Sequence, residues 1–358
     1  MTQTFVKRTA NGRFSWQQLV DVTTPVFALA LLLWTVAGAA AAYAACGPRF
    51  VATSGSDAAN DCLTAGTPCL TIQYAIDQAC AGDTINVAAG TYVEIVTPGH
   101  GAASGFPGID IDKAVVLKST AGAASTTILA NGGHFLPTSG FGPLQAVSLS
   151  SPGITIDGFT ILETNPIVNL ITADGPANSN NHTIKNNVIV NPTFNDGNAG
   201  GGWGILLGFG PVSNNTISGN DISLNPDLTK NQFTFGIWTG GGTGGPSNSN
   251  LIDGNTIHNV GSGIILDPGT GNVVSGNHFM DNAFTGIYHF GDTGTQDTLN
   301  SFQNNHASGI EVRYGAQNIL VTGNCFQNNG QSPVTYSPCV SGCTDTEAQL
   351  HATGKVFV

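Results

Sequence analysis

A short phrase in which apolar and polar residues alternate recurs along the chain, each time with an asparagine at its centre. The copies occupy residues 184–189, 217–222, 252–257, 274–279, 297–302 and 321–326, and their asparagines are Asn187, Asn220, Asn255, Asn277, Asn300 and Asn324. Successive asparagines lie 33, 35, 22, 23 and 24 residues apart, and an earlier copy at 156–161 has Phe159 in the asparagine position. A period in the twenties indicates a solenoid, in which each repeat buries its apolar face only against its neighbours.

A second set of short apolar segments begins with Gly-Ile and follows the phrases. These segments are 204–207, 236–239, 263–266, 286–289 and 309–312. The two sets give two or three short strands in each coil, separated by clusters of Gly, Asn, Asp, Ser and Pro. This pattern predicts an all-β fold, a parallel β-helix. Long helices between the strands are not indicated, which excludes a doubly wound α/β fold, and a propeller would need blades of roughly 40 residues.

Segment 71–82 has the periodicity of an amphipathic helix, with Gly82 placed to end it. A short strand and a turn are predicted directly after it, at 83–92. A helix in this position would cover the apolar end of the solenoid and its strand edges. Its apolar face comprises Ile72, Ala75, Ile76, Ala79 and Cys80.

The N-terminal 45 residues are typical of a secretory signal peptide. Lys7, Arg8 and Arg13 precede an uncharged run of 20 residues, 26–45, that ends in small residues with a candidate cleavage site before Ala45. Because 20 apolar residues can span a bilayer, an uncleaved anchor is the alternative. The predicted organisation is a signal peptide or anchor at 1–45, an N-terminal cap and first strand at 46–92, β-helix coils at 93–330, and a C-terminal cap or tail at 331–358.

The chain has seven cysteines, which suits an oxidising compartment. Structural disulfides are expected rather than a metal site, because no cluster of cysteine and histidine accompanies them; reduced, buried thiols are the alternative. The expected bridges are Cys62–Cys69, Cys339–Cys343 and Cys46–Cys80, with Cys325 left unpaired.

The formal net charge is −12, and beyond Ala44 seven Lys or Arg oppose 21 Asp or Glu, a net charge of −14. This excess of acids argues against nucleic acid and anionic membranes as partners. Only 9% of the residues are charged and 48 are glycine, yet 41% are hydrophobic, so the chain is expected to fold rather than stay disordered. We expect a monomer.

Three segments before the repeats resemble the N-terminal cap of pectin-lyase-like right-handed β-helix proteins. They are FVATSGSD at 50–57, PCLTIQYAID at 68–77 and GDTINVAAGTY at 82–92, and the asparagine phrases resemble the β-helix repeats of that superfamily. The resemblance covers residues 50–330 and implies a right-handed parallel β-helix. It is specific for fold and poor for function, because such repeats occur in lyases, hydrolases, epimerases and proteins without known activity.

The sequence departs from the enzymes of that superfamily in its acidic motifs. It has no tight group of three acids like that of polygalacturonases, and Asp267-Pro268 matches only half of the Asp-Pro-His-Asp phrase of alginate epimerases. Calcium-dependent pectate lyases stay an alternative, because their acids come from separate coils. Ca²⁺ therefore stays a candidate cofactor. Its candidate oxygen ligands are Asp110 and Asp112, which alternate with isoleucine on a predicted strand.

If the Gly-Ile strands stack in register, two columns of their side chains point outward. Since successive rungs are about 4.8 Å apart, Trp238, Tyr288 and Phe290 are candidate substrate-binding residues, because aromatic faces suit the apolar side of sugar rings. The alternative is that a loop such as 239–250 covers them. The first column is Leu206, Trp238, Ile265, Tyr288 and Glu311, and the second is Gly208, Gly240, Asp267, Phe290 and Arg313.

Asp267, Glu311 and Arg313 are the candidate catalytic residues. An arginine beside carboxylates suits a lyase acting on uronic acids, which needs a cation for the substrate carboxylate and a base for the adjacent proton. Asp267 and Glu311 should lie roughly 11–12 Å apart between their Cβ atoms. Carboxyl groups about 5–5.5 Å apart are needed by retaining glycosidases and about 6.5–9.5 Å by inverting ones, so the spacing argues against a retaining pair. A surface ion pair between Glu311 and Arg313 is the alternative.

His289 is predicted to point inward as a hydrogen-bonded core histidine. By register it shares a column with Leu207, Thr239, Leu266 and Val312.

The sequence therefore predicts a secreted β-helix protein that binds extracellular polysaccharide, with cleavage of lyase or glycoside hydrolase type left open. The alternative is a non-catalytic surface or adhesive β-helix protein.

Overall fold

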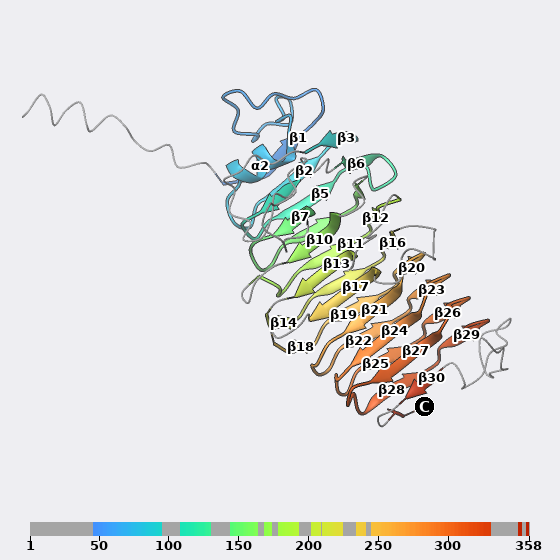
Figure 1. Ribbon diagram of the computed structural model, residues 1–358. Helices are drawn as coiled ribbons and strands as arrows, with labels where there is room; N and C mark the ends of the chain where they lie inside the picture. The colour runs from blue at the N-terminus through green and yellow to red at the C-terminus, as the bar shows by residue number, and fades with distance from the viewer. Residues whose placement is uncertain are drawn as a thin grey trace, which may run out of the picture. The chain divides into compact units, whose positions relative to one another are not determined.

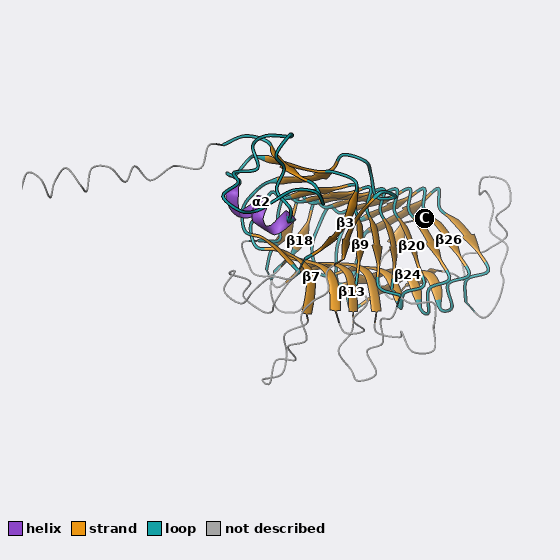
Figure 2. Ribbon diagram, turned by 90° about the horizontal axis from the view of Figure 1, so that it is seen from above, coloured by secondary structure: helices purple, strands orange, loops and turns teal. Residues whose placement is uncertain are grey.

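Parallel strands stack into long sheets along the described part of the chain, and from β2 onward each coil gives one strand to each of three sheets in the same order (Figures 1 and 2). We call these sheets I, II and III in the order in which each coil forms them. Sheet I consists of β1 (Arg49–Val51), β2 (Thr84–Val87), β5 (Val116–Ser119), β8 (Thr155–Asp157), β11 (Thr183–Lys185), β15 (Thr216–Ser218), β19 (Leu251–Asp253), β22 (Val273–Ser275), β25 (Gln296–Thr298), β28 (Ile319–Thr322) and β31 (Val356–Phe357). Sheet II consists of β3 (Gly90–Val93), β6 (Thr126–Leu129), β9 (Thr160–Leu162), β12 (Val188–Val190), β16 (Asp221–Ser223), β20 (Thr256–His258), β23 (His278–Met280), β26 (Ser301–Gln303) and β29 (Cys325–Gln327). Sheet III consists of β4 (Ile109–Ile111), β7 (Leu144–Leu149), β10 (Val168–Ala173), β13 (Gly202–Gly208), β17 (Thr234–Gly240), β21 (Ser262–Leu266), β24 (Thr285–Phe290), β27 (Ser308–Arg313) and β30 (Leu350–Ala352), and a short additional pair joins β14 (Val212–Ser213) to β18 (Ser247–Asn248).

The computed structural model describes residues 46–94, 108–129, 144–163, 168–173, 178–192, 202–208, 210–224, 234–240, 245–330, 350–352 and 356–357. The predicted signal peptide or anchor at 1–45 lies outside these residues. Within the described ranges no helix is long and apolar enough to cross a membrane. The predicted all-β parallel β-helix is confirmed, and β30 and β31 lie in the segment expected to form a C-terminal cap or tail.

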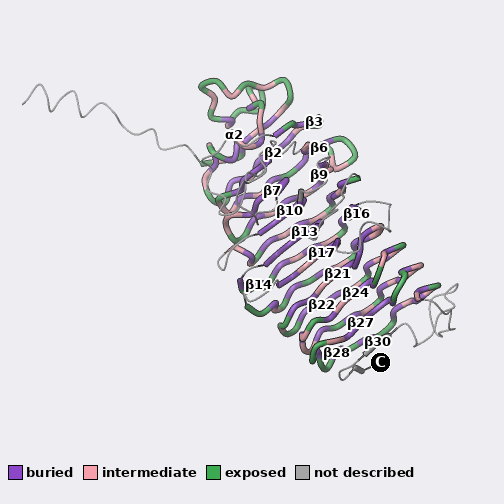
Figure 3. Tube along the Cα trace, in the orientation of Figure 1, coloured by how far each residue is buried: buried purple, intermediate pink, exposed green. Residues whose placement is uncertain are grey.

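Each sheet sends a column of apolar side chains into the interior. Along the strands of sheets I and II buried residues alternate with less buried ones, whereas the strands of sheet III are buried over most of their length (Figure 3). In sheet II the rings of Phe279, Phe302 and Phe326 stack with centroids 4.9 Å apart and interplanar angles of 6° and 10°. Full burial of such side chains contributes roughly 1.5–3 kcal/mol each. In sheet I the column of buried isoleucines on successive coils is Ile156, Ile184, Ile217 and Ile252.

The glycine of each Gly-Ile segment faces this packed core. A Cβ atom at Gly286 would lie 2.4 Å from the ring of Phe302, and one at Gly236 would lie 2.5 Å from Ile257. The isoleucine that follows is also buried, as Ile287 shows. Two successive inward residues break the strict alternation of a strand, so the residue before each glycine faces outward.

Asparagine side chains line all three corners of the described coils, where the chain passes from one sheet to the next. The predicted ladder from Asn187 to Asn324 lies between sheets I and II, and its stacking is confirmed. Two further ladders went unpredicted, although their members lie five residues before or after members of the first. They are Asn215, Asn250 and Asn272 between sheets III and I, and Asn282, Asn305 and Asn329 between sheets II and III.

Asn277 illustrates the bonding within a ladder. Its Oδ1 accepts hydrogen bonds from the backbone N–H and the Nδ2 group of Asn255, both at 2.9 Å. Its own Nδ2 group donates to the carbonyl of Ile252 at 2.9 Å and to Oδ1 of Asn300 at 3.0 Å. Each asparagine thereby satisfies backbone groups that the corner removes from the sheets, as buried polar groups require.

The predicted capping helix is present as α2 (Ile72–Gln78), with Thr71 as its N-cap and Ile72, Ala75 and Ile76 buried. It is shorter than the predicted 71–82. Ala79 has an extended backbone, and the N–H of Cys80 donates to Asp83 Oδ2 at 2.8 Å, which ends the helix before Gly82.

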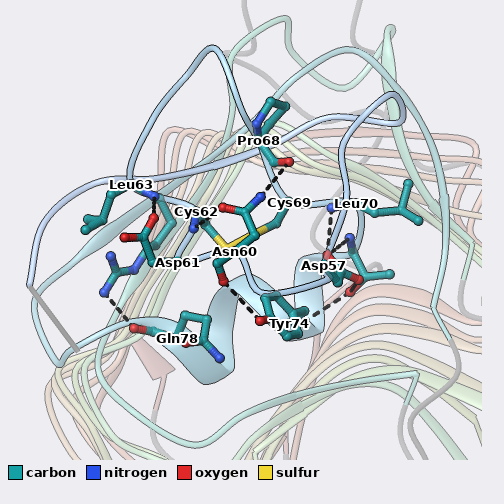
Figure 4. Close-up of a disulfide and its surroundings, with 12 residues drawn as sticks. Asp57, Asn60, Asp61, Cys62, Leu63, Pro68, Cys69, Leu70, Tyr74 and Gln78 are labelled. Atoms are coloured by element: carbon teal, nitrogen blue, oxygen red, sulfur yellow. Dashed lines mark hydrogen bonds between the residues drawn. A yellow bond between two sulfur atoms is a disulfide. The ribbon is translucent and has the colours of Figure 1, made fainter. Parts of the chain in front are cut away.

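Two of the expected disulfides, Cys46–Cys80 and Cys62–Cys69, are present. Beside the second, the Asn60 side chain accepts from the Cys62 N–H at 2.9 Å and the Tyr74 hydroxyl donates to the Asn60 carbonyl at 3.0 Å (Figure 4). The expectation of an unpaired Cys325 is wrong, because this residue is disulfide-bonded. The Cys339–Cys343 pair lies outside the described residues. These disulfides indicate folding in an oxidising compartment.

We expect Asn277→Ala to lower the free energy of unfolding by about 2–4 kcal/mol, because it removes several buried hydrogen bonds and leaves their partners unpaired. Chemical denaturation would measure the loss. The matched control is Asn304→Gly, because Asn304 has a φ of 55° that glycine also adopts and its side chain donates to Asp281 Oδ1 at an exposed site. This substitution should cost under about 1 kcal/mol. Equal losses in the two variants would contradict a structural role for the ladder.

Candidate functional site

The candidate site is the outer face of sheet III, where the predicted columns are aligned as the sequence analysis expects. Trp238 pairs with Ile265, Ile265 with Tyr288, and Tyr288 with Glu311 on successive coils. Phe290 pairs with Arg313 in the second column. Because the glycine and the isoleucine of each Gly-Ile segment both face inward, the residue before each glycine belongs to a third outward column, which was not predicted. This column consists of Trp203, Phe235, Ser262, Thr285 and Ser308.

Three aromatic side chains gather where the third column meets the first, on β13 and β17. The ring centroid of Trp238 lies 5.7 Å from that of Trp203 and 5.4 Å from that of Phe235, the latter edge-on. All three are partly buried. The indole Nε1 atoms of Trp203 and Trp238 are buried and have no hydrogen-bond partner among the described residues.

A second aromatic group lies on β24 and at the end of β27. The ring of Phe290 lies 6.3 Å from that of Tyr288 and 4.5 Å from that of Tyr314. Phe290 is 39% exposed and Tyr314 64%. Tyr314 has a backbone φ of 54°, in the turn after β27, so its ring returns to the face that Phe290 occupies. We call this second group the exposed aromatic group.

Among the candidate catalytic residues, Glu311 and Arg313 form an ion pair. Glu311 is 9% exposed, whereas the Arg313 side chain is 42% exposed. Asp267 is not part of this pair and is 6% exposed. It stacks over Gly240 of the preceding coil: a Cβ atom added at Gly240 would lie 2.2 Å from the Cβ atom of Asp267. The Phe290 coil lies between Asp267 and Arg313.

Tyr288 pairs with Glu311 on the adjacent strand, beside this ion pair. Burial, the neighbouring Tyr314 and the carboxylate of Glu311 raise the pKa of Tyr288 to about 12, although Arg313 acts in the opposite direction. The surroundings of this hydroxyl therefore disfavour negative charge.

His289 points inward, as predicted, and is fully buried. Its Nδ1 lies 3.0 Å from Asp292 Oδ2 and its Nε2 2.7 Å from Asp297 Oδ2. Thr295 donates to Asp292 Oδ2 at 2.6 Å, and all four residues are 0% exposed. Asp297 takes a position that Val274 and Val321 occupy on the adjacent coils. Because the group is enclosed, it supports the fold rather than contacting a ligand.

The acids proposed for calcium do not converge in the structure. Asp110 is 1% exposed and accepts from Ser150 at 2.6 Å, while Asp112 lies 3.3 Å from Lys113. Throughout the described ranges, no three His, Cys, Asp or Glu side chains group as metal ligands would.

Comparison with known proteins identifies the class of fold to which these sheets belong. Residues 227–347 match the family model of the right handed beta helix region. A comparison with curated proteins finds no match. With the family-model match and its stacked parallel sheets, the chain has the fold of a right-handed parallel β-helix.

Several solved structures resemble the chain at low sequence identity. The complex of XylC with xylose has a TM-score of 0.47 and 15% identity, over 79% of this chain and 69% of that chain. Pectate lyase Pel9A has a TM-score of 0.45 and 13% identity, over 86% and 78%. A point mutant of the periplasmic alginate epimerase AlgG has a TM-score of 0.40 and 16% identity, over 76% and 70%. These likenesses concern the fold alone.

We expect the buried His289 group to make stability fall at alkaline pH. Burial alone would lower the pKa of His289, but the carboxylates of Asp297 and Asp292 outweigh it and raise this pKa to about 10. Because the folded pKa exceeds the unfolded value of about 6.5, the stabilisation is complete below that value and is lost as the pH rises through about 10.

Thermal unfolding from neutral pH to about pH 10.5 would measure this loss. The control is the triple variant His289→Val, Asp292→Ala, Asp297→Val, which gives this coil the residues of the next one, Val312, Ala316 and Val321. The melting temperature of the triple variant should depend less on alkaline pH. The same pH dependence in both proteins would contradict the assignment.

Proposed function

We propose that the protein is secreted and binds an extracellular polysaccharide along the outer face of sheet III. The observation that carries this proposal is the exposed aromatic group, Tyr288, Phe290 and Tyr314, on a face that the aromatic side chains of Trp203, Phe235 and Trp238 extend. Support for secretion comes from the disulfides and from the signal-like N-terminal sequence.

The chemistry of the face suits a sugar chain. An aromatic ring offers a flat apolar surface to the C–H side of a sugar ring, and tyrosine adds a hydroxyl at its edge. Trp238 and Tyr288 stand two rungs apart, about 10 Å at the usual strand spacing. A chain lying across the coils would therefore meet aromatic surface on both β17 and β24.

Cleavage is a second proposal, favoured by the Glu311–Arg313 ion pair next to the aromatic group. Glu311 would act as the general acid or base, Arg313 would orient Glu311 and the bound chain, and Asp267 would supply a second carboxylate from the other side of Phe290. The alternative is a binding protein without catalysis, in which the ion pair has a structural role.

We expect Phe290→Ala and Tyr314→Ala each to weaken polysaccharide binding about three- to tenfold, because each removes a stacking surface worth ~0.5–1.5 kcal/mol. Affinity electrophoresis against a panel of soluble polysaccharides would measure it. Both side chains are exposed, so folding should persist. The matched control is Leu299→Ala, a 72% exposed apolar residue in the turn between sheets I and II. Equal effects of all three substitutions, or binding to no polysaccharide, would refute the proposed face.

If incubation with polysaccharide releases new chain ends, Glu311→Gln should lower the rate by at least about 100-fold, the contribution of a general acid or base. Arg313→Ala should lower it less. Assays for unsaturated and for reducing ends would separate elimination from hydrolysis. Release of ends at an unchanged rate in Glu311→Gln would exclude this residue, and no release by the wild type would leave a binding protein.

A further inference from the structure

We propose that the polysaccharide bound on this face is neutral, a chain of hexose or pentose units without carboxylates. This inference rests on the proposed binding function and narrows its substrate class.

The charges of the face do not suit an anionic chain. Among its described residues, Arg313 is the one cation, and its guanidinium group pairs with Glu311. Asp267, the other charged side chain in the columns that begin at Leu206 and Gly208, is acidic and 6% exposed. A polyuronate carries a carboxylate on each sugar, so on these columns it would meet a single cation that Glu311 already neutralises.

The Tyr288 hydroxyl reports the same electrostatic preference from within the site. Its pKa is raised to about 12 by burial and by the neighbouring Tyr314 and Glu311, which means that a negative charge at this point is unfavourable. Of these causes, the carboxylate of Glu311 would also repel a substrate carboxylate placed beside Tyr288, whereas the hydroxyl group of a neutral sugar carries no charge to repel.

The hydrogen-bonding groups of the face are uncharged. The third column places Ser262, Thr285 and Ser308 on successive coils beside the aromatic residues. Thr285 is enclosed at 1% exposed, whereas Ser262 and Ser308 are each 6% exposed. Their hydroxyl groups are uncharged and can both donate to and accept from sugar hydroxyls.

The proposed class also restricts any cleavage. Elimination from a sugar chain requires a carboxyl group, free or esterified, that makes the neighbouring proton acidic, and a chain of hexose or pentose units has none. Cleavage of such a chain would be hydrolysis: the glycosidic C–O bond breaks as Glu311 donates a proton to the leaving oxygen, the oxygen of water bonds to the sugar carbon, and the proton that this water releases passes to Asp267 or back to Glu311.

Affinity electrophoresis tests the inference with neutral and anionic gels in parallel. The neutral probes are arabinoxylan, hydroxyethylcellulose and glucomannan, and the anionic probes are polygalacturonate and alginate, each with calcium chloride and with a chelator. We expect retardation by at least one neutral probe, little change with added sodium chloride, and at least tenfold weaker retardation by both anionic probes. Stronger retardation by an anionic probe would overturn this inference and leave the proposed function standing. No retardation by any probe would overturn both.

A substitution at one exposed position gives a second test. Phe290→Lys replaces an aromatic ring by a cation, and we expect it to lose affinity for the neutral probe as Phe290→Ala does and to gain affinity for polygalacturonate. Far-UV circular dichroism would show that both variants fold. Unchanged neutral binding in Phe290→Lys would contradict stacking at this position, and stronger anionic than neutral binding by the unsubstituted protein would again exclude the neutral class.

Discussion

The β-helix depends on how its corners satisfy the backbone. At each corner the chain leaves one sheet before it enters the next, so its N–H and C=O groups lose their strand partners while the coils above and below keep water out. An asparagine side chain is short and both donates and accepts hydrogen bonds, so it can pair with these backbone groups. Stacked asparagines make the same hydrogen bonds in each successive coil. In Asn277 one side chain serves Asn255, Ile252 and Asn300 at once. Because the three asparagines have to stay aligned, the ladder holds the coils in register.

That register determines the chemistry of the outer face. Once the coils are aligned, each outward position becomes a column, and single residues from distant parts of the sequence become neighbours. The glycine of each Gly-Ile segment adds a further constraint, because the core side chain behind it, an isoleucine or a phenylalanine, leaves no room for a Cβ atom. The resulting break in alternation brings Trp203 and Phe235 onto the same face as Trp238. Core packing thus determines where the aromatic surface forms.

One coil differs from the others in both its interior and its exterior. Strand β24 carries Tyr288 and Phe290 outward and His289 inward. Inside, His289 joins Asp292 and Asp297 where neighbouring coils have apolar residues. A buried group of this kind is stabilising only while every member keeps its partner. The coil that presents the exposed aromatic group is therefore also one whose core depends on protonation.

Much of the fold could be predicted because solenoid contacts are local and periodic. The asparagine spacing predicted the parallel β-helix, and the Gly-Ile alignment predicted the outward columns and the inward His289. The sequence also contained a signal for the two missed ladders, whose asparagines keep an offset of five residues from the first. The helix was predicted too long, because its end is decided by contacts of Cys80 with Asp83 rather than by apolar periodicity.

What the sequence by itself determined is the winding of the chain: its period, its core columns and the order of residues along each outward column. Only the tertiary structure decided which side chains meet. The break in alternation brings Trp203 to Trp238, a left-handed backbone at Tyr314 returns its ring to Phe290, and stacking places Glu311 with Arg313 but leaves Asp267 apart. Periodicity specifies where residues recur, whereas the direction of a side chain at a bend or turn depends on backbone angles and on the space that neighbouring coils leave.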